Sequence, residues 1–196
     1  MNFLNKDGRE LLFTQARTHH AWQPKPVSEA VLKELYELAK WGPTSLNAAP
    51  ARIVFVTTDA AKEKLYPALM GSNVEQVRQA PVTAIIAQDL KFYEQLPKLM
   101  PAIPGAKSFF EGNEKFTHET ALRNSSLQGA YLLMAARALG LDTGPMSGFD
   151  NAKVDEAFFK GTDWKSNFIM TLGYGEPTKL YPRGPRLPFE EACKIA

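Results

Sequence analysis

The sequence predicts a single α+β domain that spans residues 1–196. Three observations predict it: an amphipathic helix stops at Gly-Pro and leads into a β-branched strand, a second buried strand follows, and a helix of about 23 residues comes after both. A composition of 44% hydrophobic and 22% charged residues is typical of a globular protein. A chain of this length removes roughly 70% of its extended surface from water on folding, so no second domain is needed.

Composition also excludes several classes of protein. No run approaches the roughly 18 to 20 apolar residues of a membrane span, and residues 1–7 lack the basic start and apolar core of a secretory signal. The single cysteine, Cys193, cannot form an internal disulfide framework and fits a reducing cytoplasm. The net charge of +2 is spread over dispersed lysines and arginines. We therefore expect a cytoplasmic protein with neither a membrane nor a nucleic-acid partner.

The first half of the chain reads as two helices and two strands. A first helix is expected over residues 7–16, and a second over about 28–41 with Ser28 as its N-cap. Pro43 cannot continue the second helix, and the apolar, β-branched residues 52–57 predict a buried strand. Asp59 is the expected N-cap of a helix that runs through Leu69. Residues 81–87 predict the second buried strand.

The second half begins with residues 88–115, whose prolines and glycines predict a mostly irregular insertion with short helical turns. Insertions of this length are often functional lids. The strongest helix signal runs from Thr117 to Leu139, with Gly140 as its stop. Its small-residue stripe fits a buried central helix and also a helix at a subunit interface; the stripe is Ala121, Ser125, Gly129, Leu132, Ala136 and Leu139. A loop, a short helix through Val154 and Phe158 with Asp150 as its cap, and a strand over 168–172 complete the chain.

The loop Trp41–Pro50 carries the first chemical signal. Small hydrogen-bonding residues at a sheet rim suit a polar planar ligand, although an ordinary helix-to-strand connection with Asn47 in a turn also fits. The amides of Asn47 and Asn73 donate and accept at once, which suits the edge of a pyrimidine ring, and each could equally cap a helix or close a turn. The arginines near the two ends of the chain could converge on a phosphate or be solvated surface residues. Three scattered histidines and one cysteine give no metal-ligand spacing.

Five phrases, in order, resemble the nitroreductase family of FMN enzymes. They are Arg17-Thr18-His19, Trp41-Gly42-Pro43-Thr44-Ser45-Leu46-Asn47, Gly144-Pro145-Met146-Ser147-Gly148-Phe149-Asp150, Leu172-Gly173-Tyr174-Gly175 and Arg183-Gly184-Pro185-Arg186-Leu187-Pro188. This resemblance implies a nitroreductase-like, homodimeric fold with a central mixed antiparallel sheet flanked by helices. It also implies FMN as cofactor, NADH or NADPH as reductant, and a small-molecule substrate.

The resemblance further implies a role for each matched residue. The FMN phosphate would be bound by Arg17, His19, Arg183 and Arg186. The flavin ring would be bound by Pro43, Thr44, Ser45 and Asn47 of one subunit and by Asn73, Pro145, Met146, Ser147 and Gly148 of the other, with Ser147 near the reactive ring atom. No side chain is assigned as catalytic, because the cofactor carries the redox chemistry.

Three phrases resemble the malonic semialdehyde reductases of bacterial uracil breakdown: Trp41-Gly42-Pro43-Thr44-Ser45, Arg123-Asn124-Ser125-Ser126 and Gly144-Pro145-Met146-Ser147-Gly148-Phe149-Asp150. This resemblance implies reduction of malonic semialdehyde to 3-hydroxypropionate. Ser147 replaces an acidic residue found in many nitroreductases, and Gly184 replaces a lysine, so Arg183 is the expected substitute. A general nitroreductase, a quinone or enone reductase, and a non-catalytic flavin-binding protein are the alternatives. The Tyr36/Lys40 pair of a short-chain dehydrogenase is rejected, because no glycine-rich nucleotide turn precedes it.

Overall fold

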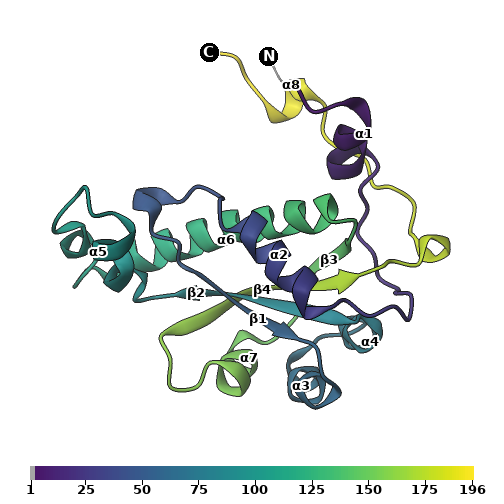
Figure 1. Cartoon of the computed structure of the whole chain (residues 1–196), viewed down its shortest axis with the longest axis horizontal. Helices are drawn as coiled ribbons and strands as arrows, with labels where there is room; N and C mark the ends of the chain where they lie inside the picture. The colour runs from purple at the N-terminus through teal and green to yellow at the C-terminus, as the bar shows by residue number, and fades with distance from the viewer. Residues whose placement is uncertain (1–2) are drawn as a thin grey trace.

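The computed structural model describes residues 3–196, and its centre is a four-stranded sheet with strand order β1-β2-β4-β3 (Figure 1). The strands are β1 (Ala51–Val56), β2 (Val82–Asp89), β3 (Asp142–Met146) and β4 (Trp164–Gly173). All three strand pairings are antiparallel. Within residues 3–196, the one parallel pairing is an isolated bridge between Thr18 and Thr143. The expected α+β architecture with an antiparallel sheet is confirmed.

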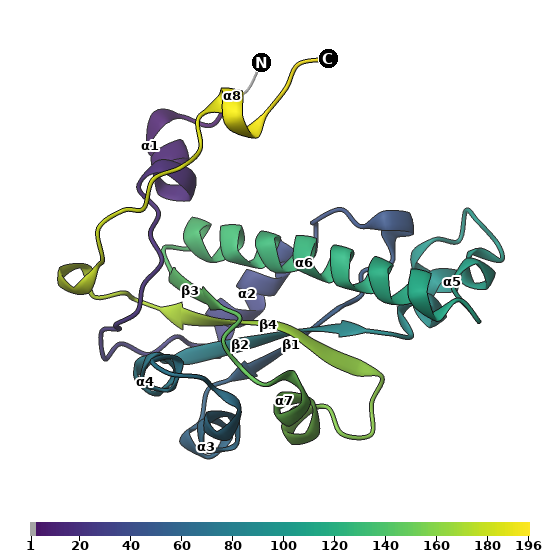
Figure 2. The same ribbon diagram turned by 180° about the vertical axis from the view of Figure 1, so that it is seen from behind.

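Helices cover both faces of this sheet. The long helix α6 (Glu114–Ala138) and α2 (Glu29–Ala39) lie on one face, and α3 (Asp59–Leu65), α4 (Asn73–Gln79) and α7 (Asn151–Phe158) lie on the other (Figures 1 and 2). Successive side chains of a strand point to opposite faces. Ile86 accordingly joins the α2/α6 core, whereas Ile85 joins the α3/α4/α7 core. Every residue of β2 is buried because both faces are covered.

Short elements complete the chain. Of the insertion expected over residues 88–115, the first two residues belong to β2 and the last two to α6, and residues 90–113 form the expected short helical turns. They pack around a small apolar core that includes Phe92, Leu96 and Phe110. None of the helices within residues 3–196 is long and apolar enough to span a membrane. The short elements are α1 (Lys6–Arg9), a π-helical turn η1 (Glu10–Thr14), η2 (Ser45–Asn47), η3 (Tyr66–Ala68), η4 (Phe92–Gln95), α5 (Leu96–Leu99), η5 (Ala106–Phe109), η6 (Pro177–Lys179) and α8 (Phe189–Ala192).

The cap predicted for α2 is confirmed, whereas the one predicted for α3 is wrong. The Ser28 hydroxyl accepts a hydrogen bond from the Val31 backbone N–H at 3.3 Å. At α3 the N-cap is Thr58, whose hydroxyl accepts from the Ala61 N–H at 3.3 Å, and Asp59 is the first helical residue. This helix ends at Leu65 rather than at Leu69, because Pro67 lies in a 3₁₀ turn that replaces the next helical turn.

Two elements were not anticipated. The segment that begins Gly144-Pro145 reads as a loop in the sequence, yet residues 142–146 form the edge strand β3. A proline is tolerated at a sheet edge because its missing N–H leaves no ladder bond broken there. The helix α4 starts at Asn73, which the sequence placed simply between two elements. Strand β4 also begins at Trp164, four residues before the expected start.

The small-residue stripe of α6 faces the molecule's own sheet. Gly129 packs so tightly there that a Cβ would lie 2.4 Å from the Phe168 ring. The buried-central-helix alternative is therefore confirmed for this face of α6. The opposite face remains uncovered in the single chain, where Leu122, Leu127 and Tyr131 are exposed.

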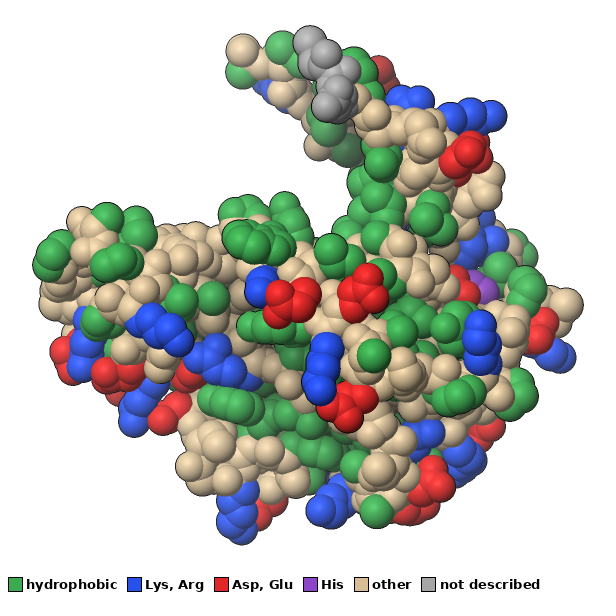
Figure 3. Space-filling view, viewed as in Figure 1, with side chains coloured by type: hydrophobic (Ala, Val, Ile, Leu, Met, Phe, Trp, Pro, Cys, Tyr) green, Lys and Arg blue, Asp and Glu red, His purple; other side chains and the backbone are tan. Residues whose placement is uncertain are grey.

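The two ends of the chain form an arm that projects from the body. Residues 3–16 and 181–196 run beside one another away from the sheet (Figures 1 and 2), and all of residues 181–196 are exposed. Two hydrogen bonds join the N-terminal and C-terminal segments near the base of the arm. Arg17 donates to the Tyr181 carbonyl, and Arg183 donates to the Ala16 carbonyl. Apolar side chains lie along this arm (Figure 3).

Candidate functional site

Four arginines converge on one pocket where the arm meets the body. The cavity has a volume of about 470 Å³ and is bounded by the N-terminal segment, the C-terminal segment and the last turn of α6. No carboxylate is among its lining residues, which are Phe13, Thr14, Ala16, Arg17, Thr18, His20, Arg137, Tyr181, Pro182, Arg183, Gly184 and Arg186. The structure thus brings together three predicted phosphate residues, Arg17, Arg183 and Arg186, from opposite ends of the sequence.

Backbone carbonyls, which carry no net charge, hold these guanidinium groups. Arg183 donates to the Ala16 carbonyl at 3.1 Å, and Arg137 donates to the Leu12 carbonyl at 2.9 Å. Arg186 donates to the carbonyls of Gly184 and Pro185 at 3.0 Å, and Arg17 donates to that of Tyr181. Within residues 3–196, none of the four forms an ion pair with a carboxylate. Four uncompensated cations around one cavity favour an anionic ligand.

His19 lies behind this pocket. Its ring is buried, with Nε2 3.4 Å from Asp142 Oδ1. Gly175 packs flat against the ring, where a Cβ would lie 1.9 Å from His19 Nδ1, so only glycine fits. Burial lowers the pKa of His19, and the nearby Asp142 carboxylate partly opposes that shift. The neighbouring His20 lines the arginine pocket. Phosphate contact by His19 stays a prediction, and this geometry gives the ring a supporting position.

A second group of predicted residues lies at the exit of β3. The Asn73 side-chain amide donates to the Gly148 carbonyl at 2.9 Å, and a Cβ on Gly148 would lie 2.7 Å from that nitrogen. Pro145 and Ser147 are exposed at the sheet edge, whereas Met146 packs partly against the α3/α4/α7 core. This edge therefore offers backbone groups and one amide side chain, and glycine at position 148 is what lets that amide approach the backbone.

The third group, Pro43 to Asn47, lies at the other end of α6. The Ser45 N–H donates to Asn124 Oδ1 at 2.8 Å, and the Asn47 amide donates to the Leu99 carbonyl at 2.8 Å. Thr44 Oγ1 accepts from the Ala49 N–H at 3.0 Å, which closes the loop on itself. Asn47 has a φ of 51°, in the left-handed region that asparagine tolerates. The loop is thus rigidly shaped by its own contacts and by α6.

One chain does not bring the loop and the arginine pocket together. Asn124 supports the loop and Arg137 lines the arginine pocket, and the two residues are 13 positions apart on α6. At 1.5 Å per residue the separation along the axis is about 20 Å. Figures 1 and 2 show the loop between α2 and β1 and the arm at opposite ends of α6. The Pro43–Asn47 loop and the arginine pocket are therefore two half-sites that lie apart in a single chain.

Sequence reasoning missed Arg137 and Asn124. An arginine in the last turn of a helix reads as a solvated residue that favours the helix dipole. Asn124 is buried inside α6 beside Ser125, and a polar residue adjoining a buried stripe was the available signal. Both residues became visible as site residues only when the fold placed other segments against them.

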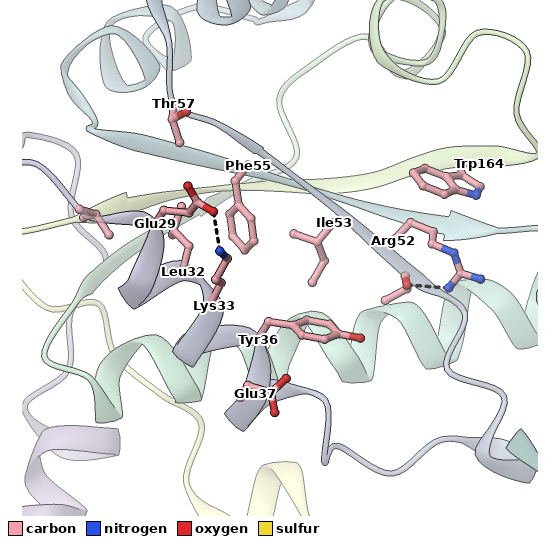
Figure 4. A pocket seen from close by; sticks show the side chains of 12 residues that line it. Glu29, Leu32, Lys33, Tyr36, Glu37, Arg52, Ile53, Phe55, Thr57 and Trp164 are labelled. Atoms are coloured by element: carbon pink, nitrogen blue, oxygen red, sulfur yellow. Dashed lines mark hydrogen bonds and ion pairs between the residues drawn. The ribbon is translucent and has the colours of Figure 1, made fainter.

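A larger cavity lies elsewhere and has different chemistry. It encloses about 910 Å³ between α2 and the free edge of β1, beside Leu32, Tyr36, Ile53, Phe55 and Trp164 (Figure 4). Its charged groups are engaged within the protein, since Lys33 pairs with Glu29 at 2.6 Å and Arg52 with Asp89 at 2.6 Å. None of the predicted flavin residues lines it. Size alone therefore does not identify the site, because a ligand pocket also needs convergent polar groups.

Comparisons with known proteins agree on one family. The model of the nitroreductase family matches residues 14–174. A protein of Stenotrophomonas maltophilia (strain K279a), which carries the provisional name NADH dehydrogenase/NAD(P)H nitroreductase, is 60% identical over 94% of both chains.

Solved structures agree on the fold. A provisionally described nitroreductase from Bacillus subtilis has a TM-score of 0.88 and 24% identity, and covers 98% of this chain and 100% of its own. A second, from Exiguobacterium sibiricum in complex with FMN, has a TM-score of 0.87 and 22% identity over 100% of both chains. At these identities the two structures show the shared fold alone. With the family model matched over most of its length and a 60% identical relative, this chain belongs to the nitroreductase family.

Proposed function

We propose that this protein is an FMN-dependent NAD(P)H oxidoreductase. The single observation that carries the proposal is the pocket of four arginines with no lining carboxylate. The FMN phosphate is a compact dianion, and planar guanidinium groups bind phosphate oxygens with two parallel hydrogen bonds. The complex of the Exiguobacterium relative with FMN and the NAD(P)H in the name of the Stenotrophomonas relative support the same cofactor and reductant.

The β3 edge fits the flavin ring. Asn73 and Gly148 are already joined there, and only glycine at position 148 allows this close contact with the Asn73 amide. In this proposal the exposed Pro145–Ser147 stretch covers the ring and excludes water. The chemistry that FMN supplies when bound is two-electron exchange between a nicotinamide and an oxidised substrate.

The complete site is proposed to form between two copies of the chain. Because the Pro43–Asn47 loop lies about 20 Å along α6 from the arginine pocket, one chain leaves each half-site incomplete. A second copy, antiparallel along α6, would bring its loop to the first copy's β3 edge. Exposed apolar side chains on the outer face of α6 and on the arm support such an interface, since large exposed apolar areas mark interaction surfaces. They include Leu122, Leu127, Tyr131, Leu11, Phe13, Leu187 and Phe189.

Malonic semialdehyde is the proposed substrate. Its carbonyl carbon would gain a hydride and its oxygen a proton, giving 3-hydroxypropionate while NAD(P)H is oxidised. Ser147 is uncharged and exposed at the proposed reactive edge. The next acidic residue, Asp150, caps α7 by accepting from the Lys153 N–H at 3.2 Å. Ser147 itself therefore adds no negative charge that would repel the carboxylate of this substrate.

A general NAD(P)H nitroreductase is the second candidate. It is favoured by the name of the 60% identical relative. The two candidates share the cofactor, the reductant and the proposed dimer, and they differ only in the final acceptor.

The test compares acceptors on the purified flavin-loaded protein. NADH or NADPH is first added anaerobically, and bleaching of the flavin absorbance is followed. Malonic semialdehyde and a panel of nitroaromatics are then compared by kcat/KM under steady-state conditions. We expect rapid bleaching and a higher kcat/KM for the semialdehyde. Robust nitro reduction with negligible semialdehyde turnover would select the second candidate, and flavin binding without bleaching would reject both.

A further inference from the structure

Arg137 occupies an unusual position for a helical arginine. It lies in the last turn of α6 and is half-buried, with its guanidinium group in the wall of the arginine pocket. Arginine offers five N–H donors. Within residues 3–196, the only oxygen that accepts from this group is the Leu12 carbonyl, at 2.9 Å from Nη1. Its Nε–H is buried and has no acceptor in the described chain.

The positive charge of Arg137 is only partly balanced by its surroundings. The nearby carboxylate, Asp142, is occupied by the Gly175 N–H at 2.8 Å and by His19 Nε2 at 3.4 Å. Burial lowers the pKa of Arg137 and Asp142 opposes that shift, but a guanidinium group stays protonated at neutral pH. Three further arginines face the same cavity. A partly buried cation with few bonded partners costs free energy, and a bound anion relieves that cost.

The four arginines differ in how firmly they are held. Arg183 and Arg186 lie in the fully exposed C-terminal segment, and Arg17 lies between the arm and the body. Arg137 instead projects from a long helix whose inner face is packed tightly against the sheet. A binding group on a rigid element loses less conformational freedom when the ligand binds.

We propose that Arg137 is a fourth phosphate-binding arginine and the one that anchors the FMN phosphate to the body of the domain. This inference rests on the proposed function and deepens it, because it names a ligand-binding residue outside the five sequence phrases. Arg183 and Arg186 bind the same anion from the arm, and Arg17 binds it from the base of the arm. The alternative is that Arg137 merely docks Leu12 and takes no part in binding.

The test measures affinity for two flavins that differ only in the phosphate. FMN and riboflavin are titrated into apoprotein, with flavin fluorescence as the readout, for the native protein, Arg137→Gln and Arg137→Lys. Arg78→Gln is the matched control, because Arg78 is an exposed arginine that pairs with Glu75 outside the pocket. We expect Arg137→Gln to lose about tenfold or more in FMN affinity, as for one charge-assisted hydrogen bond, with riboflavin nearly unchanged. Arg137→Lys keeps the charge and should lose less.

A second measurement keeps the inference falsifiable if the variants fold poorly. In the native protein, phenylglyoxal modification of Arg137 is followed by peptide mass spectrometry with FMN, riboflavin or inorganic phosphate present. We expect protection by FMN and by phosphate but not by riboflavin. Equal protection by the two flavins, or equal affinity losses in a folded Arg137→Gln, would overturn the inference. Failure of native protein to bind FMN would instead count against the proposed function, while protection by phosphate alone would still report on Arg137.

Discussion

The carboxylate of Asp142 lies 3.4 Å from Nε2 of the buried His19, directly behind the arginine pocket. The second oxygen of Asp142 accepts from the Gly175 N–H at 2.8 Å, so one carboxylate joins β3, the N-terminal segment and the end of β4. Burial lowers the pKa of His19, as do the charges of Arg17 and His20, whereas Asp142 and Glu176 raise it. Folding therefore favours the neutral imidazole.

The first prediction is a dependence of stability on pH that His19 causes. The pKa of His19 in the folded protein lies below the ordinary value of 6.5. As pH falls, His19 is therefore protonated at a higher pH in the unfolded chain than in the folded protein. The resulting stabilisation is complete above pH 6.5 and is lost as pH falls toward the folded pKa. Urea unfolding of the native protein and His19→Gln across this range checks it. The native protein should lose stability more steeply, and parallel curves would contradict the assignment.

The second prediction concerns Arg17, at the base of the arm, and Arg186, within it. Arg17→Ala and Arg186→Ala should each weaken FMN binding by about 1.5 to 3 kcal/mol, because each removes a charge-assisted bond to the phosphate. Riboflavin, which has no phosphate, should bind nearly as before. Calorimetric titration with both flavins measures the difference, with Arg78→Ala as the control outside the pocket. Equal losses for both ligands would mean that these arginines act through folding or ring contacts.

The sequence patterns predicted the elements whose signals are local. Ser28 caps α2, Asp150 caps α7, and the helix signal over 117–139 identified α6, because caps and periodicity depend on near neighbours. The edge strand β3 was missed because Gly144-Pro145 is a turn signal in isolation, and only pairing with β4 makes it a strand. Either Thr58 or Asp59 could serve as the N-cap of α3 from its residue type. In the structure Thr58 has the extended backbone of an N-cap, and Asp59 is already helical.

The site was predictable in its parts but not in its assembly. Arg17 and Arg186 are 169 residues apart in sequence, and the resemblance to a family, rather than spacing, predicted that they meet. Arg137 gives no sequence signal, because its role depends on the arm that folds over it. The small-residue stripe of α6 was compatible with packing on the chain's own sheet and with packing on a second subunit, since small residues allow close approach to a sheet as well as to another helix. Packing of Gly129 on Phe168 resolves that ambiguity for the inner face.

The third prediction separates the two faces of α6. Gly129→Ala should destabilise the fold by about 1 to 3 kcal/mol, because the added methyl overpacks the contact with Phe168. Its urea midpoint is compared with that of Ala138→Ser, an exposed change on the same helix that should cost under about 0.5 kcal/mol. A stable Gly129→Ala would mean that the inner face is looser than the structure describes.

The fourth prediction tests the outer face of α6. The native protein should scatter light as a particle of about twice the 21.8 kDa of the chain. Leu127→Asp should weaken the dimer and FMN binding together, because it places a charge on the exposed apolar face and separates the two half-sites. Leu127→Met, which keeps that face apolar, is the control. A monomer that retains tight FMN would contradict the shared site.

The last prediction concerns Ser147 and the choice of substrate. Glutamate at this exposed position would place a negative charge at the proposed reactive edge, where malonic semialdehyde brings its own carboxylate. Two unit charges about 6 Å apart in a partly dry site repel by about 3 kcal/mol at an effective dielectric constant of about 20. Ser147→Glu should therefore lower kcat/KM for the semialdehyde by tenfold or more while neutral nitroaromatics change little. In the control Ser147→Gln, the glutamine has nearly the same size as glutamate but no charge, so kcat/KM for the semialdehyde should stay close to the native value. Equal losses in the two variants would assign the effect to bulk, and the argument from charge would fail.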